Sequence, residues 1–136
     1  MGTQDRRFEA IRDLSLIESR RMQLQTAIDN GKSIESRRRL GQFATPYELA
    51  QEIMSFGLAS QDKKEISFLE PAFGTGAFYS ALLSESCKQA KIINTAIGVE
   101  VDKDFYIAAN ELWGNTNLNL VNAILLKSNH LEMSTF

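Results

Sequence analysis

The chain has 136 residues, a net charge of -2, 43% hydrophobic and 24% charged side chains, which is the composition of one globular domain and excludes a disordered tail. No apolar run approaches the ~20 residues of a membrane span, and the charged N-terminus is unlike a signal peptide, so we expect a cytoplasmic protein. One cysteine, Cys87, and one histidine, His130, allow neither an internal disulfide nor a Cys/His metal cluster, so we expect no metal.

The first forty residues are basic, with nine Lys/Arg against six Asp/Glu, and the remainder is acidic. We interpret residues 1–40 as a helical arm that ends in a linking segment at 33–41. Gly31 is expected to end a long amphipathic helix over 5–30, which is predicted by apolar residues at spacings of three, four and seven: Phe8, Ile11, Leu14, Ile17, Leu24 and Ile28.

The arm contains a cluster of arginines, Arg37, Arg38 and Arg39, with Lys32 before it. Guanidinium groups can bind nucleic acid because they release condensed counterions from phosphates. A solvated helical face is the alternative interpretation of such a cluster.

Residues 41–136 have the pattern of an α/β domain. Thr45, Pro46 and Glu48 resemble a capping box at the start of a helix that would run to Phe56 and end at Gly57. Three short apolar strands then alternate with two helices, the second capped by Asp102, which predicts a parallel sheet with right-handed crossovers: strands 65–70, 95–101 and 118–122, and helices 77–90 and 103–113.

A glycine turn follows the first strand, in the stretch LEPAFGTGAF at 69–78. Gly74 and Gly76 would lie at the carboxyl end of the sheet, where ligands bind in open α/β folds, and glycine lets a ligand approach the backbone. An ordinary tight turn is the alternative. A dinucleotide fingerprint would need a third glycine where Tyr79 stands, so the turn suits a nucleoside better than a pyrophosphate.

Two carboxylates end neighbouring predicted strands. Glu70 precedes Pro71, and Glu100 lies 24 residues after Gly76, where an acidic group can accept hydrogen bonds from ribose hydroxyls. An acidic site repels phosphate and suits a cation such as the sulfonium or amino group of S-adenosylmethionine.

These motifs resemble those of gamma-class adenine-specific DNA methyltransferases of restriction-modification systems. LEPAFGTGAF is similar to their cofactor motif, GVEVD at 98–102 to their second motif, and LGQFATP at 40–46 to the segment that folds over the methionine end of the cofactor. The resemblance implies a partial Rossmann-like methyltransferase fold of three parallel strands preceded by N-terminal helices, with residues 41–136 as a truncated cofactor-binding domain.

The resemblance also assigns cofactor contacts. Glu70 would bind the amino group and Glu100 the ribose hydroxyls of S-adenosylmethionine. Phe43 and Val101 would pack on the cofactor, although plain core packing is the alternative for both. The complete cofactor-binding set implied is Phe43, Ala44, Thr45, Glu70, Pro71, Ala72, Gly74, Gly76, Glu100 and Val101.

Two departures from the family pattern limit the expected activity. Ile124 stands where these enzymes have an aspartate for the cofactor adenine. The Asn/Asp/Ser-Pro-Pro-aromatic loop that grips a flipped-out adenine has no counterpart, because the two prolines are Pro46 and Pro71. We therefore expect no catalytic residue in this chain and no methyl transfer by the chain alone.

Our hypothesis is that the chain is the N-terminal cofactor-binding part, or a short open reading frame, of a DNA adenine methyltransferase, and that the complete methyltransferase binds DNA. Half a sheet would leave the first strand with an open apolar edge, which self-association, a missing C-terminal portion or the N-terminal helix could cover. The alternative is a non-catalytic nucleic-acid or subunit interaction module with a vestigial nucleotide pocket. A methyltransferase acting on protein or small molecules is a third possibility, which LGQFATP disfavours.

Overall fold

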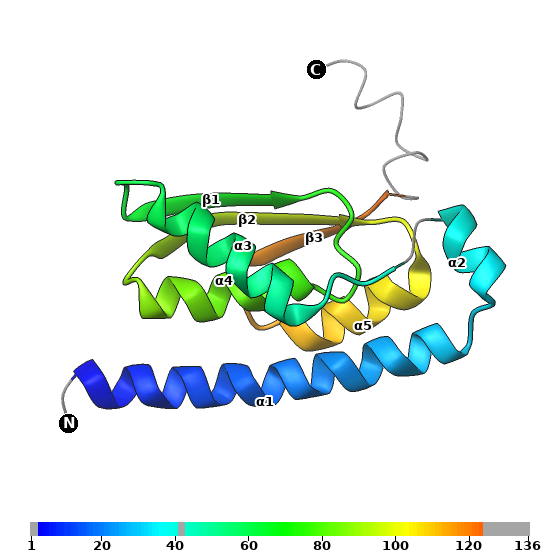
Figure 1. Ribbon diagram of the computed structural model, residues 1–136, viewed down its shortest axis with the longest axis horizontal. Helices are drawn as coiled ribbons and strands as arrows, with labels where there is room; N and C mark the ends of the chain where they lie inside the picture. Colours follow the sequence, from blue (N-terminus) through cyan, green and yellow to red (C-terminus); the bar gives the residue numbers. More distant parts are fainter. Residues whose placement is uncertain (1–2, 41–42, 124–136) are drawn as a thin grey trace, which may run out of the picture.

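The structure, a computed structural model, describes residues 3–40 and 43–123, without the side chains of residues 3–9, 11, 39 and 40. A parallel sheet forms one layer, helices α3, α4 and α5 lie beneath it, and the long helix α1 lies beneath those helices (Figure 1). In chain order the elements are α1 (Thr3–Asn30), α2 (Ile34–Leu40), α3 (Tyr47–Ala59), β1 (Glu65–Glu70), α4 (Ala77–Lys88), β2 (Ile92–Glu100), α5 (Lys103–Trp113) and β3 (Leu118–Asn122).

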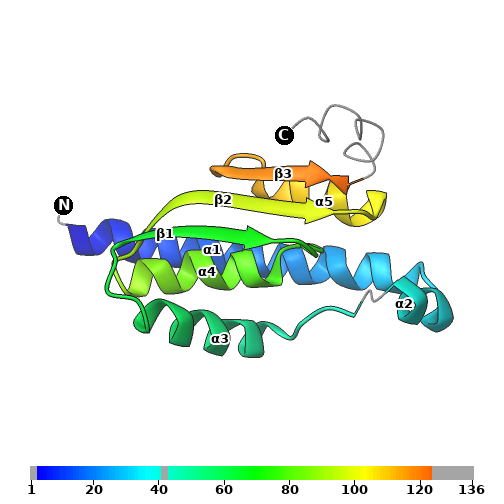
Figure 2. The same cartoon turned by 90° about the horizontal axis from the view of Figure 1, so that it is seen from above.

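The three strands are parallel, in the order β1-β2-β3. Glu70 pairs with Gly98 and Glu100 with Asn122, so the strands end at the same edge of the sheet. Figure 2 shows the strands side by side, with β1 on the side of α3. The expected α/β fold, with crossover helices between parallel strands and helices in front, is therefore present.

The core lies between the sheet and the helices beneath it. Alternate residues of the strands, such as Ile66 and Ala96, point into this layer, as the period of two requires. Tyr79 of α4 and Trp113 of α5 are fully buried there and pack edge to face, with ring centroids 5.2 Å apart. This core holds α4 and α5 under the sheet, with their first turns at the carboxyl ends of β1 and β2.

Helix α1 packs against α4 and α5. Of the expected apolar stripe, Ile17 lies against the core, whereas the side chains of Phe8 and Ile11 lie outside the described part of the chain. The most buried side chains described in α1 are polar: Glu18, Arg21 and Gln25 are 7%, 3% and 9% exposed. The apolar periodicity therefore predicted the helix but not the chemistry of its inner face.

The expected capping box is wrong. Pro46, and not Thr45, is the N-cap residue; it has an extended conformation, with φ -56° and ψ 140°, and no side chain of the described residues caps the helix, which begins at Tyr47. Gly57 does not end α3 either: the helix continues to Ala59, and the Ser60 hydroxyl donates to the Phe56 carbonyl at 2.7 Å.

Three other boundaries also differ from expectation. The linking segment contains helix α2. Helix α4 ends at Lys88, before Ala90 adopts the left-handed φ of 53°. Strand β2 begins at Ile92 because its first residues already pair with β1, ahead of an irregularity between Ile66 and Ser67.

Strand β1 is an edge of the sheet. Helix α1 lies on the far side of α4 and α5 from the sheet (Figures 1 and 2) and does not cover that edge. The division into an arm at 1–40 and a domain at 41–136 stays a prediction. Within the described residues, no helix combines the length and apolar character that crossing a membrane would need.

Candidate functional site: a cavity at the carboxyl ends of the strands

A cavity of about 290 Å³ lies where β1 and β2 end. The turns after both strands, helix α1 and the segment before α3 contribute to its wall. Of the described residues that line it, four are phenylalanines and one, Glu100, is charged. The lining is Gln25, Phe43, Ala44, Thr45, Pro71, Ala72, Phe73, Gly74, Thr75, Ala77, Phe78, Glu100, Val101 and Phe105.

The two glycines of the β1–α4 turn have different roles. Gly74 lines the cavity with φ +61°, and a Cβ built there would meet nothing within 4 Å. Gly76, with φ +97°, is buried, and a Cβ there would lie 2.6 Å from Nε1 of Trp113 and 2.8 Å from the ring of Phe73. Gly74 thus leaves open space at the site, whereas Gly76 is needed for packing behind it.

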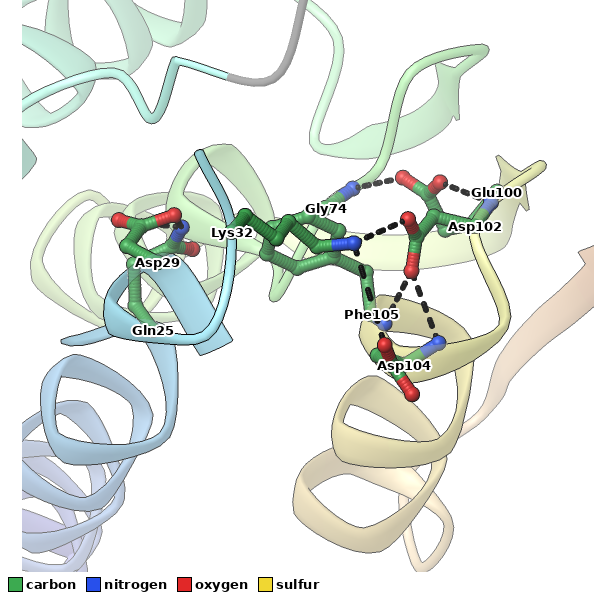
Figure 3. Close-up of polar contacts among 8 residues, drawn as sticks. All are labelled: Gln25, Asp29, Lys32, Gly74, Glu100, Asp102, Asp104 and Phe105. Carbon is green, nitrogen blue, oxygen red and sulfur yellow. Dashed lines mark hydrogen bonds and ion pairs between the residues drawn. The ribbon is translucent and has the colours of Figure 1, made fainter. Parts of the chain in front are cut away.

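Glu100 is 8% exposed and joins the two turns. Its Oε1 accepts a hydrogen bond from the Gly74 amide at 2.8 Å, and its Oε2 accepts one from the Asp102 amide at 2.7 Å (Figure 3). Each carboxylate oxygen can accept about two hydrogen bonds. Both oxygens therefore keep acceptor capacity for a ligand at the cavity wall.

Glu70 lies beside the cavity and does not line it. Its Oε1 accepts a hydrogen bond from the Ala72 amide at 2.9 Å, so the side chain turns back onto its own loop. Of the ten residues expected to bind cofactor, Glu70 and Gly76 are the two outside the lining. Their direct contact with a cofactor stays a prediction.

The segment before α3 reaches the site as expected. Phe43, Ala44 and Thr45 all line the cavity, and Phe43 and Val101 are each 53% exposed. Core packing therefore does not account for either side chain. Because Pro46 is extended, Thr45 faces the cavity instead of capping α3.

Several cavity residues were not expected from the sequence. Gln25 lies about fifty positions before the glycine turn, and no local pattern marks it. Thr75 could have been found from the sequence, since it stands between the two glycines of the motif. In the structure its carbonyl accepts a hydrogen bond from Trp113 Nε1 at 2.8 Å. Phe78, the last residue of the motif at 69–78, and Phe105, three residues after GVEVD, lie in the first turns of α4 and α5.

Of the arginine cluster, Arg37 and Arg38 are described, and neither lines this cavity. Arg37 forms an ion pair with Asp29 at 3.6 Å and lies over the ring of Phe43, 4.8 Å from its centroid. Arg38 is exposed, and the side chain of Arg39 lies outside the described part. Nucleic-acid binding by this cluster stays a prediction.

Two further sequence expectations concern adenine recognition and metal binding. Ile124 lies outside the described residues. The expectation that this chain lacks the aspartate contact to the cofactor adenine therefore stays a prediction. Across residues 3–40 and 43–123, no group of three or more His, Cys, Asp or Glu side chains is arranged to hold a metal ion.

The chain was compared with protein families, curated proteins and solved structures. No family model matches it. It is 36% identical over 90 residues to the Type II methyltransferase M.AccI of Acinetobacter calcoaceticus, and this alignment covers 65% of the chain but 15% of that relative. A Listeria monocytogenes protein assigned to the class I S-adenosylmethionine-dependent methyltransferases has a similar structure, with a TM-score of 0.58 and 17% identity over 83% of this chain and 33% of that one.

Both comparisons are with methyltransferases, which confirms the resemblance seen in the motifs at the level of a partial methyltransferase; the gamma class stays a prediction. The motifs predict S-adenosylmethionine as the cofactor, and the structural neighbour belongs to a class of methyltransferases that depend on S-adenosylmethionine. The chain has part of the class I S-adenosylmethionine-dependent methyltransferase fold and resembles a short stretch of a much longer Type II methyltransferase.

Proposed function

We propose that this chain binds S-adenosylmethionine in the cavity at the ends of β1 and β2. The observation that carries the proposal is the placement of Glu100 and Gly74 in one wall, one offering carboxylate oxygens and the other an open backbone. The ribose hydroxyls would donate to Glu100, and the phenylalanines would pack on the adenine ring. The class I fold and the motif order support this assignment.

The charge of the cavity favours this ligand over a nucleotide. Among the lining residues that the structure describes there is no Lys or Arg, and the one charge is negative. A phosphate group would therefore enter without a counter-charge, whereas a sulfonium or an amino group would be attracted. The methionine end would extend toward Phe43, Ala44 and Thr45, as the motif resemblance implies.

The parent reaction that we propose is methylation of the exocyclic amine of adenine in DNA, within a restriction-modification system. When bound, the cofactor supplies an electrophilic methyl group. The amine nitrogen of a flipped-out adenine would form a bond to the methyl carbon, the carbon–sulfur bond would break, and the amine would lose a proton. The likeness to a Type II methyltransferase supports DNA as the substrate of the complete protein.

The chain alone is proposed to bind cofactor without transferring methyl groups, in the cytoplasm. The sequence has no Pro-Pro-aromatic loop to hold the target base. The chain spans 15% of the curated relative it matches, so the recognised DNA sequence and the target base belong to the complete protein. Adenine methylation is tested by digesting DNA treated with that protein and identifying the methylated nucleoside.

The open edge of β1 is proposed to be covered by a second copy or by a further portion of the parent protein. The described helices α1, α3, α4 and α5 all lie on one side of the sheet (Figure 1). On the other side Leu69 is 65% exposed, and Ile97 and Val99 point the same way by the register of the strands. Sedimentation of the purified chain tests self-association.

Binding is tested by calorimetry with S-adenosylhomocysteine, adenosine and ATP. We expect S-adenosylhomocysteine to bind, adenosine to bind more weakly, and ATP to give no heat, because its phosphates would meet no cation among the described lining residues. Equal affinity for ATP would contradict the proposed ligand class. Labelled S-adenosylmethionine with DNA should give no transfer, and measurable transfer would show that the chain is active alone.

The alternative, a non-catalytic module that binds nucleic acid through α2, has one observation in its favour. Arg38 is exposed beside Arg37 on the same short helix. Salt-dependent DNA binding that is lost on Arg38→Ala, together with no heat from S-adenosylhomocysteine, would favour this module over a cofactor-binding domain.

A further inference from the structure

Helix α1 contacts the glycine turn directly. Nη1 of Arg21 donates to the Thr75 hydroxyl at 3.0 Å, and that hydroxyl donates to Oε1 of Gln25 at 2.8 Å. All three side chains are buried, Thr75 being 1% exposed. The residue between the two glycines is therefore fixed by two side chains from more than forty positions earlier in the chain.

The charge of Arg21 is balanced inside the protein. Glu18 accepts from Nε at 2.6 Å and from Nη2 at 2.8 Å, so the guanidinium is held at its fork while Nη1 remains for Thr75. Burying such a pair costs desolvation, and well-packed apolar residues often stabilise a fold as much or more. Stability alone is thus a weak reason for this pair, whereas orientation of Thr75 is a specific consequence of it.

The residue that follows the C-terminal end of α1 by two positions, Lys32, contacts the second turn. Its Nζ lies 2.8 Å from Oδ2 of Asp102, and its ammonium is 5.7 Å from the centroid of the Phe105 ring (Figure 3). The other oxygen of Asp102 caps α5 by accepting from the amides of Asp104 and Phe105. The hydrogen bond to Asp102 raises the pKa of Lys32, so the contact stays charged.

The two contacts of α1 meet at Glu100. Asp102, held by Lys32, gives its amide to one oxygen of Glu100, and Gly74, next to Thr75, gives its amide to the other. Figure 3 shows this path from Lys32 through Asp102 to Glu100 and Gly74. Displacing either turn relative to α1 would change the position of the carboxylate that faces the cavity.

We propose that Arg21, Gln25 and Lys32 are positioning residues, through which helix α1 holds both turns of the cofactor cavity in their binding geometry. The inference rests on the proposed function, since the ligand is taken to be S-adenosylmethionine or its product. Helix α1 then works as part of the cofactor site, and the inward-facing cations Arg21 and Lys32 are not available to DNA.

The expected consequence is a loss of affinity larger than any loss of stability. A ligand that meets preformed turns does not have to order them. Removing the contacts from α1 therefore adds the free energy of ordering the turns to the cost of binding. Lys32 is the better test than Arg21, because Arg21→Met would leave Glu18 buried without its partner and could unfold the protein. Lys32→Met keeps the length of the side chain and removes its charge.

The test compares Lys32→Met, Lys32→Arg and the control Arg20→Met, whose exposed ion pair also joins α1 to α5 through Glu111. We expect Lys32→Met to bind S-adenosylhomocysteine about tenfold more weakly, Lys32→Arg to restore most of the affinity, and Arg20→Met to bind like the wild type. The urea midpoint of Lys32→Met should fall somewhat more than that of Arg20→Met, because the pair with Asp102 is the more buried of the two, and both variants should be folded where binding is measured. An affinity of Lys32→Met equal to that of the wild type would overturn the proposal, as would a loss shared by Arg20→Met.

A ligand-free measurement separates this inference from the proposed function. In two-dimensional NMR spectra, Lys32→Met should shift the amide resonances of Gly74, Asp102 and Asp104, and Gln25→Met should shift those of Gly74 and Thr75. Shifts confined to residues next to the substituted residue in the sequence would overturn the positioning role of α1, even if the wild type binds ligand. Failure of the wild type to bind S-adenosylhomocysteine would overturn the cofactor assignment itself, whatever the spectra show.

Discussion

Oε1 of Glu100 accepts the amide hydrogen of Gly74 at 2.8 Å, which bonds the end of β2 to the turn that follows β1. The second oxygen accepts the Asp102 amide at 2.7 Å. One buried carboxylate at the cavity wall therefore satisfies a backbone donor in each turn and keeps further acceptor capacity. The same side chain shapes the site and is placed to contact the ligand.

Glu100→Gln should weaken both the fold and ligand binding. The amide keeps the size of the side chain but replaces one acceptor oxygen by an NH₂ donor, which would face the amide of Gly74 or Asp102. We expect the free energy of unfolding to fall by about 1–3 kcal/mol and S-adenosylhomocysteine to bind at least about tenfold more weakly. Urea unfolding and calorimetry measure the two effects.

The matched control for this variant is Glu111→Gln, an exposed carboxylate of α5 in an ion pair with Arg20. Surface pairs of this kind contribute little, so this variant should unfold and bind like the wild type. Equal behaviour of the two variants would show that Glu100 has no special role in the turns.

The two glycines of the turn provide a second test, because both have positive φ but differ in surroundings. Gly76→Ala should cost about 3–4 kcal/mol, since backbone strain adds to a clash with Trp113 and Phe73. Gly74→Ala should cost about 1 kcal/mol, from backbone strain alone. The difference in free energy of unfolding between the two variants is the measured quantity. Similar losses for Gly74→Ala and Gly76→Ala would mean that Trp113 and Phe73 move aside to accommodate the new methyl group.

A methyl group at Gly74 would also add volume at a residue that lines the cavity. We therefore expect Gly74→Ala to lose affinity for S-adenosylhomocysteine out of proportion to its small loss of stability. Binding as tight as that of the wild type would indicate that the ligand does not approach this part of the turn.

The sequence predicted the elements whose signals are local. Strands β1 and β3 have the expected bounds because each is a short apolar run between turn residues, and Asp102 caps α5 with the geometry that its position suggested. Eight of the fourteen described lining residues belong to the set that the contiguous motifs implied, whereas Phe73 and Thr75 of the same turn were not expected; cofactor binding by that set stays a prediction.

The errors arose where tertiary contacts or backbone geometry decide. Thr45 and Glu48 match a capping box, yet Pro46 is extended, so the threonine is directed to the cavity. Helix α2 has no apolar periodicity to reveal it. Gln25 could not be found from sequence, because its role depends on a hydrogen bond to Thr75 across fifty positions.

Gly57→Ala should stabilise the protein. Gly57 lies inside α3, and a Cβ there would meet nothing within 4 Å. Alanine has the higher helix propensity and restricts the unfolded chain, so the free energy of unfolding should rise by about 0.5–1 kcal/mol. A decrease in the urea midpoint would show that Gly57 is not a helical residue with open space around it. Ligand affinity should be unchanged, because Gly57 is not part of the cavity lining.

The stability of the protein should fall at alkaline pH. The hydrogen bond to Asp102 raises the pKa of Lys32 above 10.5, and burial raises the pKa of the Tyr79 phenol above 10.0. A group whose pKa is higher in the folded state holds its proton more tightly there, so its stabilising contribution is complete below the unfolded pKa and is lost as pH rises through the folded one. The loss should therefore begin above about pH 10.

Urea unfolding from about pH 8 to about pH 11 measures this loss. Tyr79→Phe removes the phenol and should flatten the alkaline part of the curve, and Lys32→Met should flatten it separately, because the two groups belong to different contacts: the phenol lies in the core and the ammonium reaches from the end of α1 to the cap of α5. A wild-type stability that is constant or rises above about pH 10 would show that neither proton is held more tightly in the folded protein.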